Sequence, residues 1–197
     1  MSLQQEPQSP QQPVPRSPLL LDRRLSRLLV IDVQKKLVDV IPVAKQLVMN
    51  CVRLVQAAGL CNVPVFATEQ YPKGLGPTVK PLAQLLPERP EKLRFSCVEC
   101  LGWRPAGESE CRDVVLAGIE THVCVLQTAL DLLSLGYNVF VPADAVASRH
   151  KLDWEWALRR LETNGVTVTT TEAVLFEWCE TAAFERFKEL SLLVKEN

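Results

Sequence analysis

Cys124 is the residue in this sequence best placed for nucleophilic chemistry. It follows a continuous apolar run, Asp113–Gly118 (DVVLAG), and a short turn, and it falls in the first turn of a predicted helix with Thr121 as its N-cap. A helix N-terminus presents free N–H groups and positive potential, which stabilise a thiolate and can hold an oxyanion. A site that lowers the pKa of Cys124 to near neutrality would make the thiolate dominant. The alternative is an inert cysteine packed in the core.

Asp32 and Lys92 are two charged residues suited to act on such a thiol. Asp32 lies near the end of the apolar run Arg27–Val33 (RLLVIDV), where a carboxylate can serve as a general base. Lys92 precedes an extended stretch, Leu93–Ser96, and in the same pocket it would favour the thiolate and polarise a bound substrate. Each has an ordinary alternative, because a strand-end aspartate often caps the next segment and most lysines are solvated surface charges.

The elements that must position these residues alternate along the chain. Strands are predicted over 27–33, 63–68, 113–118, 138–142 and 166–170, with an extended stretch over 92–96, and helices over 43–59, 81–86, 121–135, 153–164 and 181–195. Continuous apolar strands between helices predict an α/β fold: a three-layer α/β/α sandwich with a mostly parallel central sheet. Ligands bind at the carboxyl edge of such sheets, so we expect Asp32, Thr68–Glu69, Gly118–Thr121 and Asp144 to converge there.

Composition narrows the class of protein. The 197 residues suit one domain, 19–197, preceded by a Pro/Gln-rich tail, 1–18, that is too poor in apolar residues to fold alone. A net charge of -1 and an aromatic content of 6% disfavour a nucleic-acid binder, which needs a basic groove with aromatic side chains. No apolar run reaches the roughly 20 residues of a membrane helix, and no signal-peptide core is present.

The cysteines and histidines do not predict a metal site. Seven cysteines without a secretory signal indicate a reduced compartment, and Cys97 and Cys100 form a C-x-x-C without the second pair that zinc sites use. His122 lies two residues before Cys124 and on a helix points to a different side, so we expect a surface or packing role for it. We expect a cytoplasmic protein with no metal and no cofactor; arginines near the N-terminus leave a mitochondrial leader as an alternative.

Three stretches together resemble the isochorismatase-like hydrolase family, also called cysteine hydrolases, whose fold is of the Rossmann type. They are LLVIDVQKKL at Leu28–Leu37, KLRFSC at Lys92–Cys97 and VVLAGIETHVCVLQTALDLLSLG at Val114–Gly136. A fourth, TEQYPKGLGPTV at Thr68–Val79, resembles the branch of isochorismatase domain-containing proteins. The likeness covers most of residues 27–188.

The resemblance implies a catalytic triad of Asp32, Lys92 and Cys124. The aspartate takes the thiol proton, the cysteine attacks a carbonyl, and water hydrolyses the thioester. The resemblance also implies a non-proline cis peptide at Ile119–Glu120 and an oxyanion hole formed by the backbone N–H groups of Glu120 and Cys124.

At some positions this sequence differs from the family's pattern, and these differences disfavour some of the family's reactions. Nicotinamidases carry an Asp-x-His…His metal site after the second strand, whereas TEQYPKGL contains no histidine here. Bacterial isochorismatases lack the cysteine nucleophile, so vinyl-ether hydrolysis is also disfavoured. Cys97, Val98 and Glu99 stand where the family often has small residues, and the pocket wall is expected to differ accordingly.

We therefore expect a metal-independent cysteine hydrolase that cleaves C–N bonds of a small amide or related acyl substrate. Substrate contacts are expected near Gln34, Tyr71, Phe95 and Ile119. The family commonly forms symmetric assemblies, so a homo-oligomer (dimer or tetramer) is expected, with contacts at the tail or at the helix that bears Trp154 and Trp156. The alternatives are a binding or scaffold subunit with the same fold and a nucleic-acid-processing protein; the intact triad favours the hydrolase.

Overall fold

A parallel sheet forms the centre of the computed structural model, which describes residues 15–195. Its strand order is β3-β2-β1-β4-β5-β7, with β6 paired to β4, and all of these pairs are parallel. The strands are β1 (Ser26–Ile31), β2 (Val65–Gln70), β3 (Glu91–Lys92), β4 (Asp113–Ile119), β5 (Asn138–Pro142), β6 (Val146–Ala147) and β7 (Thr167–Thr169).

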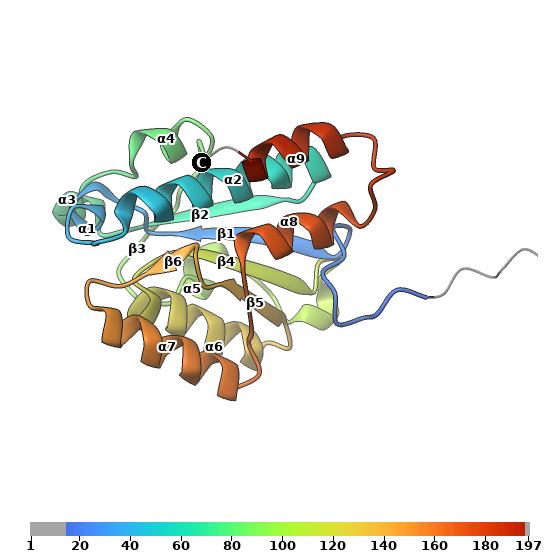
Figure 1. The fold of residues 1–197 in the computed structure, drawn as a ribbon. Helices are drawn as coiled ribbons and strands as arrows, with labels where there is room; N and C mark the ends of the chain where they lie inside the picture. The colour runs from blue at the N-terminus through green and yellow to red at the C-terminus, as the bar shows by residue number, and fades with distance from the viewer. Residues whose placement is uncertain (1–14, 196–197) are drawn as a thin grey trace, which may run out of the picture.

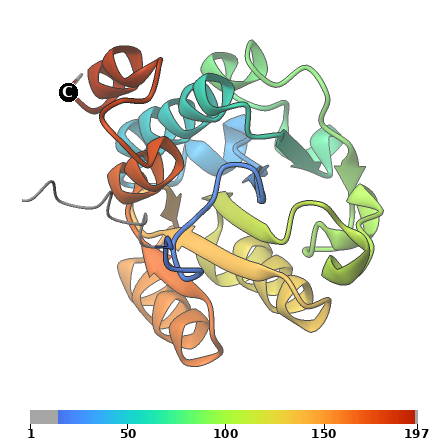
Figure 2. The same ribbon diagram turned by 90° about the vertical axis from the view of Figure 1, so that its right-hand side faces the viewer.

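Helices cover both faces of the sheet, which confirms the predicted three-layer sandwich (Figure 1). On one face lie α2 (Ala44–Cys61), α8 (Thr171–Cys179) and α9 (Phe187–Lys195); on the other lie α6 (Leu126–Ser134) and α7 (Lys151–Thr163). Figure 2, viewed from the amino edge, shows the sheet between these two groups. The short elements are α1 (Lys35–Val38), α3 (Pro72–Leu75), α4 (Lys80–Ala83), α5 (Val98–Leu101), the 3-10 turn η1 (Ala106–Glu108) and the π-helical turn η2 (Thr121–Val125).

The two central strands, β1 and β4, are buried on both faces. Leu28 and Val30 of β1 pack under α2, while Leu29 and Ile31 belong to the core beneath α6 and α7. All seven residues of β4 are buried. This two-sided burial is the reason that both strands appear in the sequence as unbroken apolar runs rather than alternating ones.

Several predicted boundaries were wrong, and each has a local cause. Helix α2 runs past Gly59 to Cys61, because Asn62 takes the left-handed conformation (φ 57°) and closes it. Strand β2 lies two residues later than predicted, since the N–H of Val63 still bonds to Ala58 of α2. The closing helix starts only at Phe187. Helix α8 was missed because its polar residues, Thr171, Glu172 and Glu177, lie on different sides, so it lacks a clear helical period.

The predicted tail, 1–18, lies largely outside the described residues. At its end, the guanidinium of Arg16 donates hydrogen bonds to the carbonyls of Leu21 and Glu177 at 2.6 and 2.7 Å, which joins this segment to α8. Between residues 15 and 195, no helix is long and apolar enough to cross a membrane.

Gly118 allows β1 and β4 to approach closely near the site. Its φ is 120°, and a Cβ built there would clash with the backbone of Ile31. We expect Gly118→Ala to lower the free energy of unfolding by about 3 kcal/mol or more, measured by urea denaturation. Gly59→Ala is the matched control: Gly59 is helical with open space around it, so the same change should be neutral or slightly stabilising. An equal loss in the free energy of unfolding of the two variants would contradict this account.

Arg27 lies at the amino edge of the sheet, where it contacts the chain segment between β3 and β4. Its guanidinium lies 4.5 Å from the ring centroid of Trp103, 5.5 Å from that of Tyr137 and 5.9 Å from that of Phe66, and donates to the carbonyl of Cys111. Arg27→Met should lower the free energy of unfolding by about 2 kcal/mol, through lost cation–π and hydrogen-bond energy. Denaturation in urea measures this. Because Arg27 lies at the far end of β1 from Asp32, a changed reactivity of Cys124 in this variant would argue against a purely local role.

Candidate functional site

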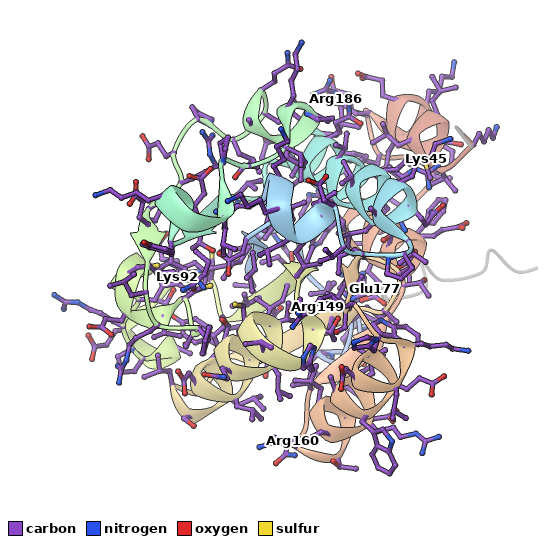
Figure 3. All side chains as sticks on the ribbon, turned by 90° about the vertical axis from the view of Figure 1, so that its left-hand side faces the viewer. Lys45, Lys92, Arg149, Arg160, Glu177 and Arg186 are labelled. Atoms are coloured by element: carbon purple, nitrogen blue, oxygen red, sulfur yellow. The ribbon has the colours of Figure 1, made fainter. Side chains whose placement is uncertain are left out.

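Asp32, Lys92 and Cys124 meet at the carboxyl edge of the sheet. Asp32 directly follows β1, Lys92 is the last residue of β3, and Cys124 lies in the turn after β4. The Nζ of Lys92 is 2.7 Å from Oδ2 of Asp32 and 3.7 Å from Sγ of Cys124. All three residues are buried. Figure 3 looks onto this edge, with Lys92 at one side of it and Arg149 nearer the middle.

The carboxylate of Asp32 is held from two sides. Its Oδ2 pairs with Lys92, and its Oδ1 accepts a hydrogen bond of 2.8 Å from the hydroxyl of Thr68 on β2. The backbone of Asp32 is left-handed (φ 52°), a conformation that aspartate tolerates better than most residues and that turns the chain at the strand end. The carboxylate therefore has a fixed orientation.

The ammonium of Lys92 has more acceptors than protons. Besides Asp32, it lies 2.7 Å from Oε1 of Gln70, 2.9 Å from the carbonyl of Phe95 and 3.3 Å from the carbonyl of Arg94. Burial, the largest single cause, would lower the pKa of Lys92, but the charge and hydrogen bond of Asp32 together with the nearby sulfurs of Cys97 and Cys124 more than offset it, so the pKa is raised. Lys92 is therefore a permanent cation, with its N–H groups taken by the protein.

Cys124 lies in the π-helical turn η2, which begins after the cis peptide Ile119–Glu120. The cis bond implied by the family resemblance is thus confirmed. The predicted N-cap, Thr121, is wrong by one residue: Glu120 is the N-cap, and its side chain makes no capping hydrogen bond. The hydroxyl of Thr121 is buried and has no hydrogen-bond partner within residues 15–195.

The prediction that the site lowers the pKa of Cys124 was wrong. Burial raises the pKa of the Cys124 thiol, the negative charge of Asp32 raises it further, and Lys92 only partly offsets them. In the free protein the sulfur is therefore protonated, next to a carboxylate that can accept its proton. This arrangement is that of a thiol and a general base rather than that of a preformed thiolate.

The end of β2 contributes Thr68, which was expected at this edge, and Gln70, which sequence reasoning missed. Because side chains alternate along a strand, Thr68 and Gln70 face the site, whereas Glu69 points to the other side, where it bonds to Thr78 and Arg89. The predicted strand ended at Thr68, which placed Gln70 in a loop. Extending the alternation by two residues would have found it.

The four predicted pocket residues occupy different environments. Gln34 and Ile119 are fully buried, whereas Tyr71 and Phe95 are about half-exposed at 51% and 49%. The side-chain amide of Gln34 bonds to the backbone of Gln70 and Gly76. Their contact with a substrate remains a prediction.

Other polar groups at this edge make separate clusters. The buried carboxylate of Glu120 pairs with Arg149 at 3.0 Å, and Nδ1 of His122 lies 3.0 Å from the hydroxyl of Ser148. The prediction that Asp144 joins the site was wrong. Its carboxylate accepts hydrogen bonds from Thr171 and from Asn50 of α2, because the chain turns toward α8 and α2 after β5.

Cavities at the carboxyl edge flank the triad without being lined by it. One of about 530 Å³ lies between the 93–99 segment and α6, and Phe95 is part of its wall. A mostly apolar one of about 410 Å³ lies between the first turns of α2 and α7. Cys124 is only 5% exposed, so solvent reaches little of this residue. No group of three His, Cys, Asp or Glu side chains able to hold a metal occurs in residues 15–195, and all seven cysteines are free thiols.

Comparison with known proteins finds relatives in sequence and in fold. Residues 106–173 match the isochorismatase domain. Isochorismatase domain-containing protein 2 of Bos taurus is 40% identical over 171 residues, which cover 87% of this chain and 83% of the relative. The solved structure of MAR1 ribonuclease from Caenorhabditis elegans is 37% identical with a TM-score of 0.82, over 90% of this chain and 93% of that one. The YcaC gene product of Escherichia coli, described as an octameric hydrolase of unknown specificity, shares the fold at 22% identity (TM-score 0.79, 91% of each chain).

Proposed function

We propose, since the chain belongs to the isochorismatase family, that it is a hydrolase in which Cys124 is the nucleophile, Asp32 the general base and Lys92 the charge that holds both. The observation that carries the proposal is the contact of these three buried side chains at the carboxyl edge of the sheet. A protonated thiol beside a carboxylate and an ammonium is equipped for the attack of sulfur on an electrophilic carbon.

The reaction would run in two steps. Asp32 takes the proton from Cys124, and the sulfur attacks the substrate carbonyl while the backbone N–H groups of Glu120 and Cys124 hold the oxyanion. The leaving amine takes the proton from Asp32, which leaves a thioester on Cys124. Water then gives a proton to Asp32 and attacks the thioester, which releases the acid and restores the thiol. No metal or cofactor takes part in the proposed steps.

The substrate proposed is a small amide or related acyl compound. The low exposure of Cys124 supports a small reacting group, and the half-exposed rings of Tyr71 and Phe95 would supply apolar contact. Gln34 and Ile119, which are buried, would shape the site from behind.

A screen of small primary amides, ureides and p-nitrophenyl esters tests the proposal, with release of ammonia or nitrophenol as the readout. Turnover by the wild type that falls to background in Cys124→Ala supports it. Turnover that is equal in Cys124→Ala, or absent from a broad panel, contradicts it. Cys61→Ala is the matched control, because Cys61 is also a buried thiol but lies at the end of α2.

RNA cleavage is the alternative that needs its own test, because one relative is described as a ribonuclease. The net charge of -1 gives a polyanion little attraction. We therefore expect no cleavage of a labelled RNA above the level seen with Cys124→Ala. Cleavage that depends on Cys124 or Asp32 would replace the small-molecule proposal.

We also propose a homo-oligomer. Helix α7 supports this: Trp154 packs inward by donating to the carbonyls of Ala143 and Val146, whereas Trp156 and Leu152 on the same helix are 60% and 63% exposed. Light scattering with size-exclusion chromatography should give more than one chain per particle, and Trp156→Lys should lower that number. A monomeric wild type would refute this part of the proposal.

A further inference from the structure

Gln70 is a second side chain, besides Asp32, that accepts a short hydrogen bond from Lys92. Its Oε1 lies 2.7 Å from Nζ of Lys92, as close as the carboxylate of Asp32. Its Nε2 donates to the carbonyl of Leu93 at 2.9 Å. A carbonyl only accepts and an ammonium only donates, so this amide can be oriented in one way alone, with its oxygen toward Lys92.

The backbone of Gln70 is itself held in place. Its N–H donates to Oε1 of Gln34 at 2.6 Å, and its carbonyl accepts from Nε2 of Gln34 at 3.0 Å. The residue also pairs with Lys92 in the β2–β3 register. The side chain thus reaches Lys92 from a rigid point, as a positioning residue must.

The number of N–H groups on Lys92 can be compared with the number of acceptors around its Nζ. An ammonium carries three N–H groups. Three acceptors lie within 2.9 Å of Nζ: Oδ2 of Asp32, Oε1 of Gln70 and the carbonyl of Phe95. The carbonyl of Arg94, at 3.3 Å, and the sulfur of Cys124, at 3.7 Å, are the two more distant acceptors of this nitrogen. With its three protons directed to these nearest acceptors, Lys92 makes only a long contact with the sulfur.

We propose that Gln70 is a positioning residue that occupies the third proton of Lys92 in the free protein and so withholds it from the sulfur of Cys124. The thiol then keeps its own proton until a substrate is in place. The inference builds on the proposed role of Cys124 as the nucleophile, but its consequence is a change in thiol reactivity that needs no turnover to be seen.

Two substitutions at Gln70 should act in opposite directions. Gln70→Met keeps the length and removes the oxygen, which frees an N–H of Lys92 for the sulfur; the rate of alkylation of Cys124 by iodoacetamide should rise about tenfold at fixed pH. Gln70→Glu keeps an acceptor and adds a negative charge near the sulfur, so the rate should fall about tenfold. Full pH profiles should shift in the same two directions.

The measurement is peptide mass spectrometry of Cys124 labelling in the full chain. In a Lys92→Met background, Gln70→Met should have no further effect, because the proton that it frees no longer exists. Thr171→Val is the control: it removes a buried hydroxyl bonded to Asp144, away from Lys92, and should leave the rate unchanged.

Equal rates in the wild type and Gln70→Met, or a change in the same direction for both substitutions, would overturn the inference. So would an effect of Gln70→Met that persists without Lys92. If Gln70→Met does not fold, the slower labelling expected of Gln70→Glu still decides the matter. Because labelling is independent of hydrolysis, these rates stand even if no amide is turned over, and the two proposals fail separately.

Discussion

Asp32→Asn should make Cys124 more reactive toward an alkylating reagent and yet nearly abolish turnover. The negative charge of Asp32 is, after burial, the largest cause that raises the pKa of the Cys124 thiol. Removing this charge lowers the pKa, so more thiolate is present at any fixed pH, and the rate of labelling by iodoacetamide should rise by about tenfold or more. Asparagine also tolerates the left-handed backbone at this position (φ 52°), so the turn should be kept, although the variant loses stability because the buried Lys92 loses its charged partner.

The same variant lacks the general base of the proposed reaction. Loss of such a base lowers the rate of turnover by about 10²–10⁴-fold. Labelling is read by mass spectrometry across pH, and turnover is read on any substrate found by the amide and ester screen. A variant in which both rates fall together would show that Asp32 acts by maintaining the structure, and one in which turnover survives would remove Asp32 from the mechanism.

Lys92→Met should have the largest effect on stability. Lys92 and Asp32 form a buried ion pair, with side chains only 2% and 0% exposed. Removing one partner leaves an uncompensated charge in the interior, which costs about 3–5 kcal/mol. We expect a loss of this size in the free energy of unfolding by urea, together with slower labelling of Cys124, because the cation that lowers the pKa of its thiol is gone.

The double variant Asp32→Asn with Lys92→Met is the matching control. It removes both charges, so it should recover much of the stability lost in Lys92→Met while remaining inactive. Lys36, whose Nζ bonds only to the exposed carbonyl of Gly74, provides a surface comparison: Lys36→Met should change stability by less than about 0.5 kcal/mol. A double variant as unstable as the single one would mean that the ion pair is not the source of the loss.

The parts of this molecule that the sequence predicted are those where one physical requirement dominates. The buried strands β1, β4 and β5 appear as apolar runs because both faces of the sheet are covered. Strand ends in a parallel sheet meet at one edge, so the meeting of Asp32 with the turn of Cys124 followed from topology. Lys92 was a different case, since β3 is only two residues long and only the family resemblance singled it out.

The parts that were missed depend on three-dimensional contacts that no single segment encodes. Gln70 became a site residue because β2 runs two residues beyond its apolar stretch in order to pair with β3. The raised pKa of Cys124 reflects the depth of burial together with the nearness of Asp32, neither of which is visible in the turn itself. Helix α8 was missed because its polar residues do not gather on one side and its exposed face carries Phe176 beside Glu172.

The most direct test of the central claim is to trap the thioester on Cys124. The protein is mixed with p-nitrophenyl acetate and quenched in acid within the first turnover. The masses of the cysteine-containing peptides are then measured by mass spectrometry. The account predicts one acetyl group on Cys124, removable by hydroxylamine, with a burst of p-nitrophenol that is absent from Cys124→Ala. An unlabelled Cys124, or a burst of the same size in Cys124→Ala, would contradict the claim that this cysteine is the nucleophile.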